Sequence, residues 1–170
     1  MNLADIKSFP SKQMATRNLV KEGWDKLSKL PFGKELFSYL VGRAAPYTGN
    51  IRATVVELRP GYAKVVVNER GSIRNHLRSI HAIALANLAE LAGNIALSYV
   101  LPDDARFIVT KMDITYSKKA RGTIFAIGEC PIPTTSKRQE YIVPVKIIND
   151  KDEILCQATL HSLVGPKPQS

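Results

Sequence analysis

The stretch from residue 79 to residue 99 limits how this chain can fold more than any other part of the sequence. Drawn as an α-helix, it is apolar on nearly every side, and Pro102 follows it as a stop signal. Four polar residues within the apolar stretch 80–101 make a membrane span expensive: His81, Asn87, Glu90 and Asn94. We therefore predict a buried helix of a soluble protein, with no membrane span. Such a helix has to be enclosed by other elements.

Runs of β-forming residues on both sides of the helix predict the sheet that encloses it. Residues 51–55 and 62–67, joined by a turn at 59–61, predict a hairpin before the helix. Four strands are predicted after it, at 107–116, 123–130, 139–148 and 153–164. Alternation in the first of these places five residues on one face: Ile108, Thr110, Met112, Ile114 and Tyr116. The predicted fold class is α+β, a curved antiparallel sheet of about six strands wrapped around one long central helix.

Two short helices are predicted before the sheet. Residues 12–29 and 33–41 have the apolar spacing of amphipathic helices, and Pro31 separates them. A chain of 170 residues is long enough to bury one full core. We therefore expect one domain, composed of a helical segment at 1–45, the sheet with its long helix at 46–165, and a disordered tail at 166–170.

The charge balance limits the choice of partner. The chain has 24 Lys and Arg against 15 Asp and Glu, a formal charge of +9, which favours an anionic or phosphate-bearing partner. No recognisable RNA or DNA motif and no aromatic-rich basic face accompany this charge, so nucleic acid ranks last among the partners. The N-terminus lacks the uninterrupted apolar core of a secretory signal, so we expect a cytoplasmic protein.

The two cysteines point to no cofactor site. Cys130 and Cys156 lie inside strand-like runs and lack the spacing of metal ligands. We interpret them as reduced core thiols, with neither a disulfide nor a metal site, in agreement with a cytoplasmic location.

The long helix carries a polar stripe that burial alone does not explain, because buried polar groups need partners or a purpose. Four residues fall within an arc of about 80° on a helix that turns about 100° per residue: Asn87, Glu90, Asn94 and Ser98. His81 and Glu90, nine residues apart, lie on opposite sides of the helix and roughly 13.5 Å apart along its axis. One chain cannot bring them together. A shared site would need a second copy, with the two central helices antiparallel beside a two-fold axis.

The segment that enters the helix resembles a known family. An Asn six residues before a His, with an acidic residue nine after it, is similar to the phenylacetyl-CoA-thioesterase-like branch of the hotdog-fold thioesterases. Asn75, His81 and Glu90 match those positions. Residues 117–122, SKKARG, resemble the segment after that family's first post-helix strand, and the strand order agrees over about residues 46–165. The run NHLRSIHAIALANLAELAG resembles more closely a branch of thioesterase-like proteins of unassigned function.

The resemblance implies the hotdog fold and the hydrolysis of an acyl-CoA or acyl-carrier thioester, with coenzyme A as part of the substrate and no other cofactor. Glu90 would be a general base toward water or a nucleophile toward the carbonyl carbon. Asn75 would orient substrate or water. His81 and the backbone N–H of Ala82, near the positive end of the helix dipole, would polarise the thioester oxygen.

The resemblance also implies a substrate-binding surface and an assembly. Lys118, Lys119 and Arg121 would meet the phosphates of the nucleotide, with Gly122 in the same turn. Asn87 and Asn94, which share the polar stripe with Glu90, are expected to bind the substrate as well. The site would be shared by two chains in a homodimer or a dimer of dimers.

This chain departs from the family's pattern at one point, since Ala82 and Ile83 replace two glycines after the His. A β-branched side chain obstructs the close approach of a ligand to the backbone. The alternative is therefore a catalytically silent acyl-thioester-binding protein, with a hotdog dehydratase behind it. Simpler interpretations also stay open: Glu90 as a structural carboxylate, His81 as a helix cap, Asn75 as a loop-ordering residue, and the basic cluster as a solvated turn.

Overall fold

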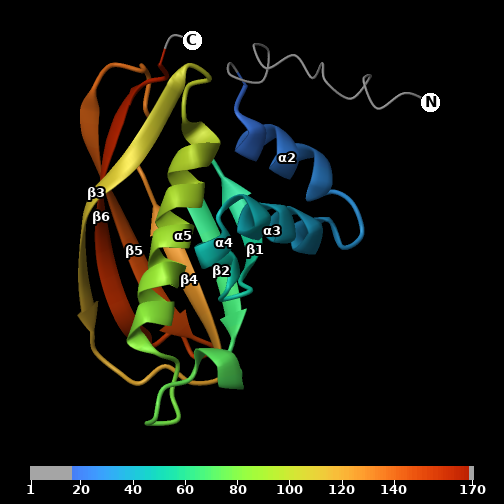
Figure 1. Ribbon diagram of the computed structural model, residues 1–170, viewed down its shortest axis with the longest axis vertical. Helices are drawn as coiled ribbons and strands as arrows, with labels where there is room; N and C mark the ends of the chain where they lie inside the picture. Colours follow the sequence, from blue (N-terminus) through green and yellow to red (C-terminus); the bar gives the residue numbers. More distant parts are fainter. Residues whose placement is uncertain (1–16, 169–170) are drawn as a thin grey trace, which may run out of the picture.

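In the computed structural model, which describes residues 17–168, a six-stranded antiparallel sheet curves around helix α5 (Ala82–Val100) (Figure 1). The strands lie in the order β1-β2-β4-β5-β6-β3. Their bounds are Thr54–Arg59 for β1, Tyr62–Asn68 for β2, Ala105–Tyr116 for β3, Thr123–Glu129 for β4, Gln139–Asn149 for β5 and Ile154–Pro166 for β6. The predicted α+β fold is confirmed.

Helix α5 lies against the sheet because most of its surface is apolar. Leu88 and Leu97 of the helix and Leu160 of β6 are completely buried. Burying one such side chain contributes about 1.5–3 kcal/mol. By length and composition α5 could cross a membrane, but 61% of its most apolar window is buried inside the protein. It is therefore the core helix that the sequence predicts.

A glycine in β4 lets the helix backbone approach the sheet. A Cβ atom at Gly128 would lie 2.6 Å from the carbonyl oxygen of Ala92 and 3.0 Å from the nitrogen of Gly93. Both are backbone atoms of α5, which a rotamer change cannot move aside. Only a residue without a side chain fits between the helix and β4 at this point.

Helices α2 (Leu19–Leu27), α3 (Gly33–Ala44) and α4 (Pro46–Gly49) cover the edge of the molecule beside β1 and α5 (Figure 1). The rings of Trp24 and Phe37 pack edge to face with centroids 5.2 Å apart and belong to the same core as the sheet. Asn18 caps α2 through the N–H of Lys21, and its amide donates to the Ser98 carbonyl oxygen at 2.7 Å. Of the helix predicted at 12–29, residues 12–16 lie outside the described residues, and α3 continues past its predicted end at 41.

The predicted alternation of β3 is wrong along half of the strand. The pairing of β3 with β6 shifts register between Val109 and Lys111. Before the bulge, the half-buried residues are the odd-numbered Phe107 and Val109; after it, they are the even-numbered Met112 and Ile114. Ile108, which was predicted to share a face with Met112 and Ile114, is therefore 64% exposed. An extra residue in one strand reverses the faces of all residues beyond it, and a pattern that alternates on paper does not reveal it.

The two cysteines are free thiols within the protein. Cys156 is buried and Cys130 half-buried, and burial raises the pKa of each thiol to about 11. Both are therefore protonated and unreactive near neutral pH. In the predicted tail, Pro166 ends β6 and the Lys167 N–H donates to the Asp104 carbonyl oxygen at 2.7 Å. Residues 169–170 lie outside the described residues.

Replacing Gly128 by alanine tests the close contact of α5 with β4. The added methyl group would overlap the α5 backbone, so we expect Gly128→Ala to lower the free energy of unfolding by about 2–4 kcal/mol. Urea unfolding followed by circular dichroism measures the change. Gly165→Ala in β6 is the matched control, because nothing lies within 4 Å of its added Cβ. An equal decrease in the free energy of unfolding in the two variants would contradict the role assigned to Gly128.

Candidate functional site at the central helix

The N-terminus of α5 is held by His81 and by the loop before it. His81 is the N-cap residue, in an extended conformation, and its Nδ1 accepts the N–H of Ile83 at 3.1 Å. The helix therefore begins at Ala82 and not at residue 79. Because Nδ1 accepts this bond, the ring proton of the neutral imidazole lies on Nε2. Capping and the predicted role in binding the thioester oxygen thus involve different atoms of His81.

Asn75 orders the loop through one atom of its side chain. Its Oδ1 accepts the N–H groups of Leu77 at 2.9 Å and Ser79 at 3.2 Å, and also the Ser79 hydroxyl. The loop-ordering interpretation is confirmed. The side-chain Nδ2 makes no hydrogen bond with any residue in 17–168 and so remains a donor for a ligand.

A cavity of about 300 Å³ at the N-terminus of α5 brings four of the predicted site residues together. It is lined by Asn75, Ala82, Lys118 and Lys119, with Tyr116 as a further wall. The Tyr116 hydroxyl donates to the Ala82 carbonyl oxygen at 3.1 Å, and burial raises the pKa of this phenol. Because Ala82 is the first residue of the helix, its own N–H has no acceptor within the helix.

The predicted basic cluster is only partly available to an anion. The Lys118 ammonium lies 3.0 Å from a carboxylate oxygen of Glu153, and both side chains are about half exposed. Such a surface pair is weak and exchanges readily with another anion. Arg121 is turned toward the loop before α5, where its Nε donates to the Arg78 carbonyl oxygen at 3.1 Å.

Glu69, which the sequence analysis did not identify, joins the turn at Gly122 to the loop before α5. One carboxylate oxygen accepts the N–H of Gly122 at 2.6 Å, and the other accepts Nε of Arg74 at 2.6 Å. The Gly122 N–H, followed by Arg74, holds the pKa of Glu69 below its usual range. Gly122 has φ of +70°, a conformation that favours glycine. A single carboxylate just after a strand has no spacing pattern that sequence analysis could detect.

Glu90 and Asn94 lie together on the outer face of α5. Both side chains are half-buried, and the Asn94 amide donates to a Glu90 carboxylate oxygen at 3.5 Å. Two amide oxygens of the predicted stripe, in Asn87 and Asn94, are buried without a hydrogen-bond partner. The Asn87 amide nitrogen donates to the Tyr47 carbonyl oxygen of α4 at 3.3 Å. The stripe therefore keeps acceptor atoms that a further group could satisfy.

The predicted site residues do not form one cluster within the chain. Glu90 is eight residues after Ala82, roughly 12 Å along the helix axis. Among residues 17–168, no hydrogen bond or ion pair joins Glu90 to Asn75 or His81. A smaller cavity of about 210 Å³ takes in His81 together with Asn87. The expected separation of Glu90 from His81 in one chain is confirmed.

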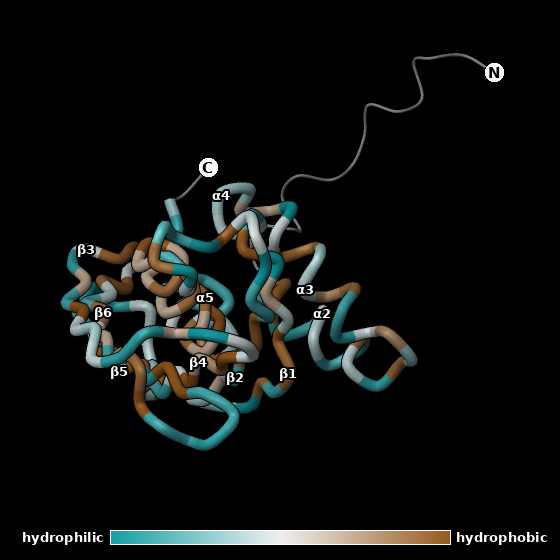
Figure 2. Tube along the Cα trace, turned by 90° about the horizontal axis from the view of Figure 1, so that it is seen from below, coloured by the Kyte–Doolittle hydropathy of each residue, from teal (hydrophilic) through white to brown (hydrophobic). Residues whose placement is uncertain are grey.

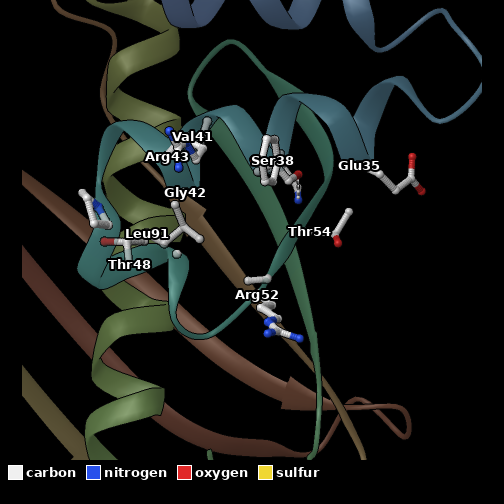
Figure 3. Close-up of a pocket in the computed structure, with 14 residues that line it drawn as sticks. Glu35, Ser38, Val41, Gly42, Arg43, Thr48, Arg52, Thr54 and Leu91 are labelled. Atoms are coloured by element: carbon white, nitrogen blue, oxygen red, sulfur yellow. Dashed lines mark hydrogen bonds between the residues drawn. The ribbon is translucent and has the colours of Figure 1, made fainter. Parts of the chain in front are cut away.

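A larger cavity, of about 610 Å³, lies where the sequence predicts no site. It is enclosed by α3, α4 and residues 52–55, and α5 contributes Leu91, the residue after Glu90. Figure 3 shows Leu91, Gly42 and Thr48 on one side, with Arg52 at a margin. Thirteen of its fourteen lining residues lie within residues 35–55, and this stretch carries no motif that points to a site. In the described part of the chain, no three His, Cys, Asp or Glu residues are grouped to hold a metal ion.

Comparison with known proteins agrees with the sequence resemblance. A family model described as a domain of unknown function (DUF4442) matches residues 33–164. The crystal structure of the genomics protein APC5556 is 30% identical, with a TM-score of 0.75 over 88% of this chain and 99% of that one. The search of curated proteins finds no match.

Two further solved structures have the same fold at lower identity. PA5026 from Pseudomonas aeruginosa, described as a protein of unknown function and probable thioesterase, is 21% identical. Its TM-score is 0.71 over 81% of this chain and 97% of its own. The thioesterase HI1161 from Haemophilus influenzae is 14% identical, with a TM-score of 0.67 over 81% of this chain and 94% of its own. The resemblance to hotdog-fold, thioesterase-like proteins is confirmed.

Glu69→Gln tests the connection between the loop and the turn. A carboxylate whose pKa is lowered in the folded state adds stability above its usual pKa of 4.5, and this stability is lost as the pH falls through the lower, folded value. We expect the variant to unfold about 1–2 kcal/mol more easily at pH 7. The difference from the native chain should shrink below pH 4.5. Glu57→Gln, which removes a surface ion pair with Arg59, is the control. A pH-independent difference would contradict the role of the Glu69 charge.

Proposed function

Because the chain belongs to the DUF4442 family and has the hotdog fold, we propose that it hydrolyses acyl-CoA or acyl-carrier thioesters to free acid and thiol. One observation carries the proposal: Glu90 lies on the outer face of a core helix beside amide oxygens that lack partners. A half-buried carboxylate with incompletely satisfied polar neighbours is typical of a site completed by substrate or by another chain. PA5026 and HI1161, which have the same fold, are described as a probable thioesterase and a thioesterase.

In the proposed reaction Glu90 takes a proton from a water molecule as the water oxygen attacks the thioester carbonyl carbon. The negative charge then develops on the carbonyl oxygen, which the free N–H of Ala82 and the Nε2–H of His81 would stabilise. The C–S bond breaks, and the sulfur leaves as a thiol with the proton from Glu90. The Ile83 N–H cannot assist, because the His81 ring already accepts it.

We propose that two copies of the chain complete each site. Strand β3 is an edge strand of twelve residues that pairs only with β6 among the described strands. A long unpaired edge favours pairing with another chain. If β3 pairs with its two-fold mate, the outer face of α5 faces the partner, and Ile83, 55% exposed, would be covered. Glu90 of one chain could then meet the N-terminal cavity of the other.

The two cavities suggest where the nucleotide and the acyl group of an acyl thioester would bind. The 300 Å³ cavity offers Lys119 and the exchangeable Lys118 to the phosphates of a nucleotide. The 610 Å³ cavity is of a size that holds small molecules, and it has an apolar wall of Val41, Val55 and Leu91. The acyl group would enter there, against Leu91, the residue after Glu90.

A non-catalytic acyl-thioester-binding protein is the second candidate. It is favoured by the exposed Ile83 side chain at the N-terminus of α5, which obstructs close approach of a ligand to the backbone. Such a protein would bind the same ligand without turning it over.

Release of free thiol from short, long and aromatic acyl-CoAs tests the hydrolysis. We expect turnover by the native chain and a loss of about 100-fold or more in Glu90→Gln, because a general base contributes that much. Glu57→Gln, a change of the same kind at an exposed ion pair far along the chain, should leave the rate unchanged. Binding without thiol release would support the second candidate, and the absence of binding would rule out both.

Mixing two inactive variants tests the shared site. Asn75→Asp keeps the Oδ1 acceptor that orders the loop but removes the free Nδ2 donor, so it should fold while losing activity. If each site combines Glu90 of one chain with Asn75 of the other, a mixed dimer of Asn75→Asp and Glu90→Gln has one intact site. Reassociation of equal amounts should restore about a quarter of the native rate. A mixture as inactive as its components would place both residues in one chain.

A further inference from the structure

The turn between α2 and α3 exposes an aromatic ring on a strained backbone. Phe32 has φ of +57°, in the left-handed region, and its side chain is 83% exposed. Residues with a Cβ pay free energy for this conformation, and glycine or asparagine adopts it readily. Phe32 precedes α3 without a side-chain cap, so helix capping does not explain its presence. Its carbonyl oxygen accepts the Leu36 N–H at 3.0 Å, but this backbone bond does not require an aromatic side chain, so a strained residue with an exposed ring calls for a purpose outside its own chain.

Other apolar side chains gather on the same part of the molecule. Seven of the fourteen large hydrophobic residues exposed within the described residues belong to α2, α3, α4 and the α2–α3 turn: Leu19, Leu30, Phe32, Leu36, Tyr39, Leu40 and Tyr47. Leu36 and Leu40 share one face of α3, because they are four residues apart. Figure 2 shows the α2–α3 unit projecting from the side of the sheet, with hydrophobic colouring at its outer turn. We call Leu30, Phe32 and Leu36 the apolar tip.

The apolar tip is held in place by the packing beneath it. The rings of Trp24 in α2 and Phe37 in α3 pack against each other and hold the two helices together. The Lys34 ammonium of α3 donates to the Val56 carbonyl oxygen of β1 at 2.7 Å. A side chain at Gly33 would overlap the Leu27 carbonyl group, so glycine permits the tight approach of the two helices. The tip is thus displayed outward by a packed support and does not fold back onto the core.

The surroundings of the apolar tip are cationic. Residues 17–49 contain six Lys and Arg against three Asp and Glu. Two of these carboxylates are already paired, Glu22 with Arg17 at 2.6 Å and Asp25 with Lys21 at 2.7 Å. Lys26 and Lys29, close to the tip in sequence, form no salt bridge with any residue in 17–168. Apolar side chains flanked by free lysines are the combination that binds an anionic lipid surface.

We propose that the apolar tip, with Lys26 and Lys29, docks on the surface of an anionic lipid membrane, inserting Phe32 between the headgroups. Charge complementarity selects this partner. A second copy of the chain would place lysines against lysines across a two-fold contact. The N-terminal residues 1–16 contain two lysines and one carboxylate, so their net charge has the same sign as that of the tip's surroundings. The proposal does not depend on hydrolysis of a thioester.

Sedimentation of the full chain with vesicles tests the docking. The bound fraction should be high on phosphatidylcholine vesicles with about one third phosphatidylglycerol, low on pure phosphatidylcholine, and lower in high salt. Phe32→Gly should reduce binding about tenfold while folding at least as stably as the native chain, because glycine relieves the strained φ. Weaker binding together with unchanged stability would distinguish a docking role from a structural one, because truncating a packing residue would also lower the melting temperature.

Further variants make the outcome decisive. Lys26→Glu with Lys29→Glu should abolish the preference for phosphatidylglycerol. Ile132→Asn removes an exposed apolar side chain from the loop after β4 and should leave binding unchanged. Equal binding by the native chain and Phe32→Gly would overturn the proposal. So would a change in the molecular mass of Phe32→Gly in solution, because the tip would then be a contact between chains.

Discussion

The contact of α5 with the concave face of the sheet determines where this protein can carry chemistry. Gly128 lets the β4 backbone reach the α5 backbone at Ala92, and complete burial of Leu88 and Leu97 holds the helix there. With the sheet on one side and α4 on another, only the face with Ile83, Glu90 and Asn94 stays open along the helix. Polar groups on α5 can therefore reach a ligand only from this face or from the N-terminus.

These two places are separated by roughly 12 Å of rigid helix, which explains the division of the site. The N-terminal cavity has a free helix N–H, a donor on Asn75 and two lysines, but none of its described lining residues is a carboxylate. The open face has the Glu90 carboxylate, and the Asn94 amide on that face already donates to it. Each place has what the other lacks, and a two-fold arrangement of antiparallel helices would join them. This complementarity favours a shared site over one built within a single chain.

The N-terminal helices do more than extend the core. Trp24 and Phe37 join them to it, and α3 with α4 forms most of the lining of the 610 Å³ cavity beside Leu91. The same helices display the apolar tip on the outside, where Phe32 is strained and exposed. The same helical segment therefore contributes both to a cavity and to an exposed apolar surface.

Local patterns in the amino-acid sequence were enough to define the elements and the fold class. The period of its apolar residues predicted α5 and the strands, and turn residues such as Gly61 separated β1 from β2, because both signals are local. The resemblance carried by Asn75, His81 and Glu90 is also local, and the fold that it implies is correct. Only the tertiary structure decided which distant groups meet. The bulge at Val109 and the two bonds of Glu69 depend on strand register and on contacts between distant parts of the chain, and Leu91 reaches the cavity of residues 35–55 only because α5 packs there. Neighbouring residues carry no record of these contacts, because they arise from segments that only folding brings together.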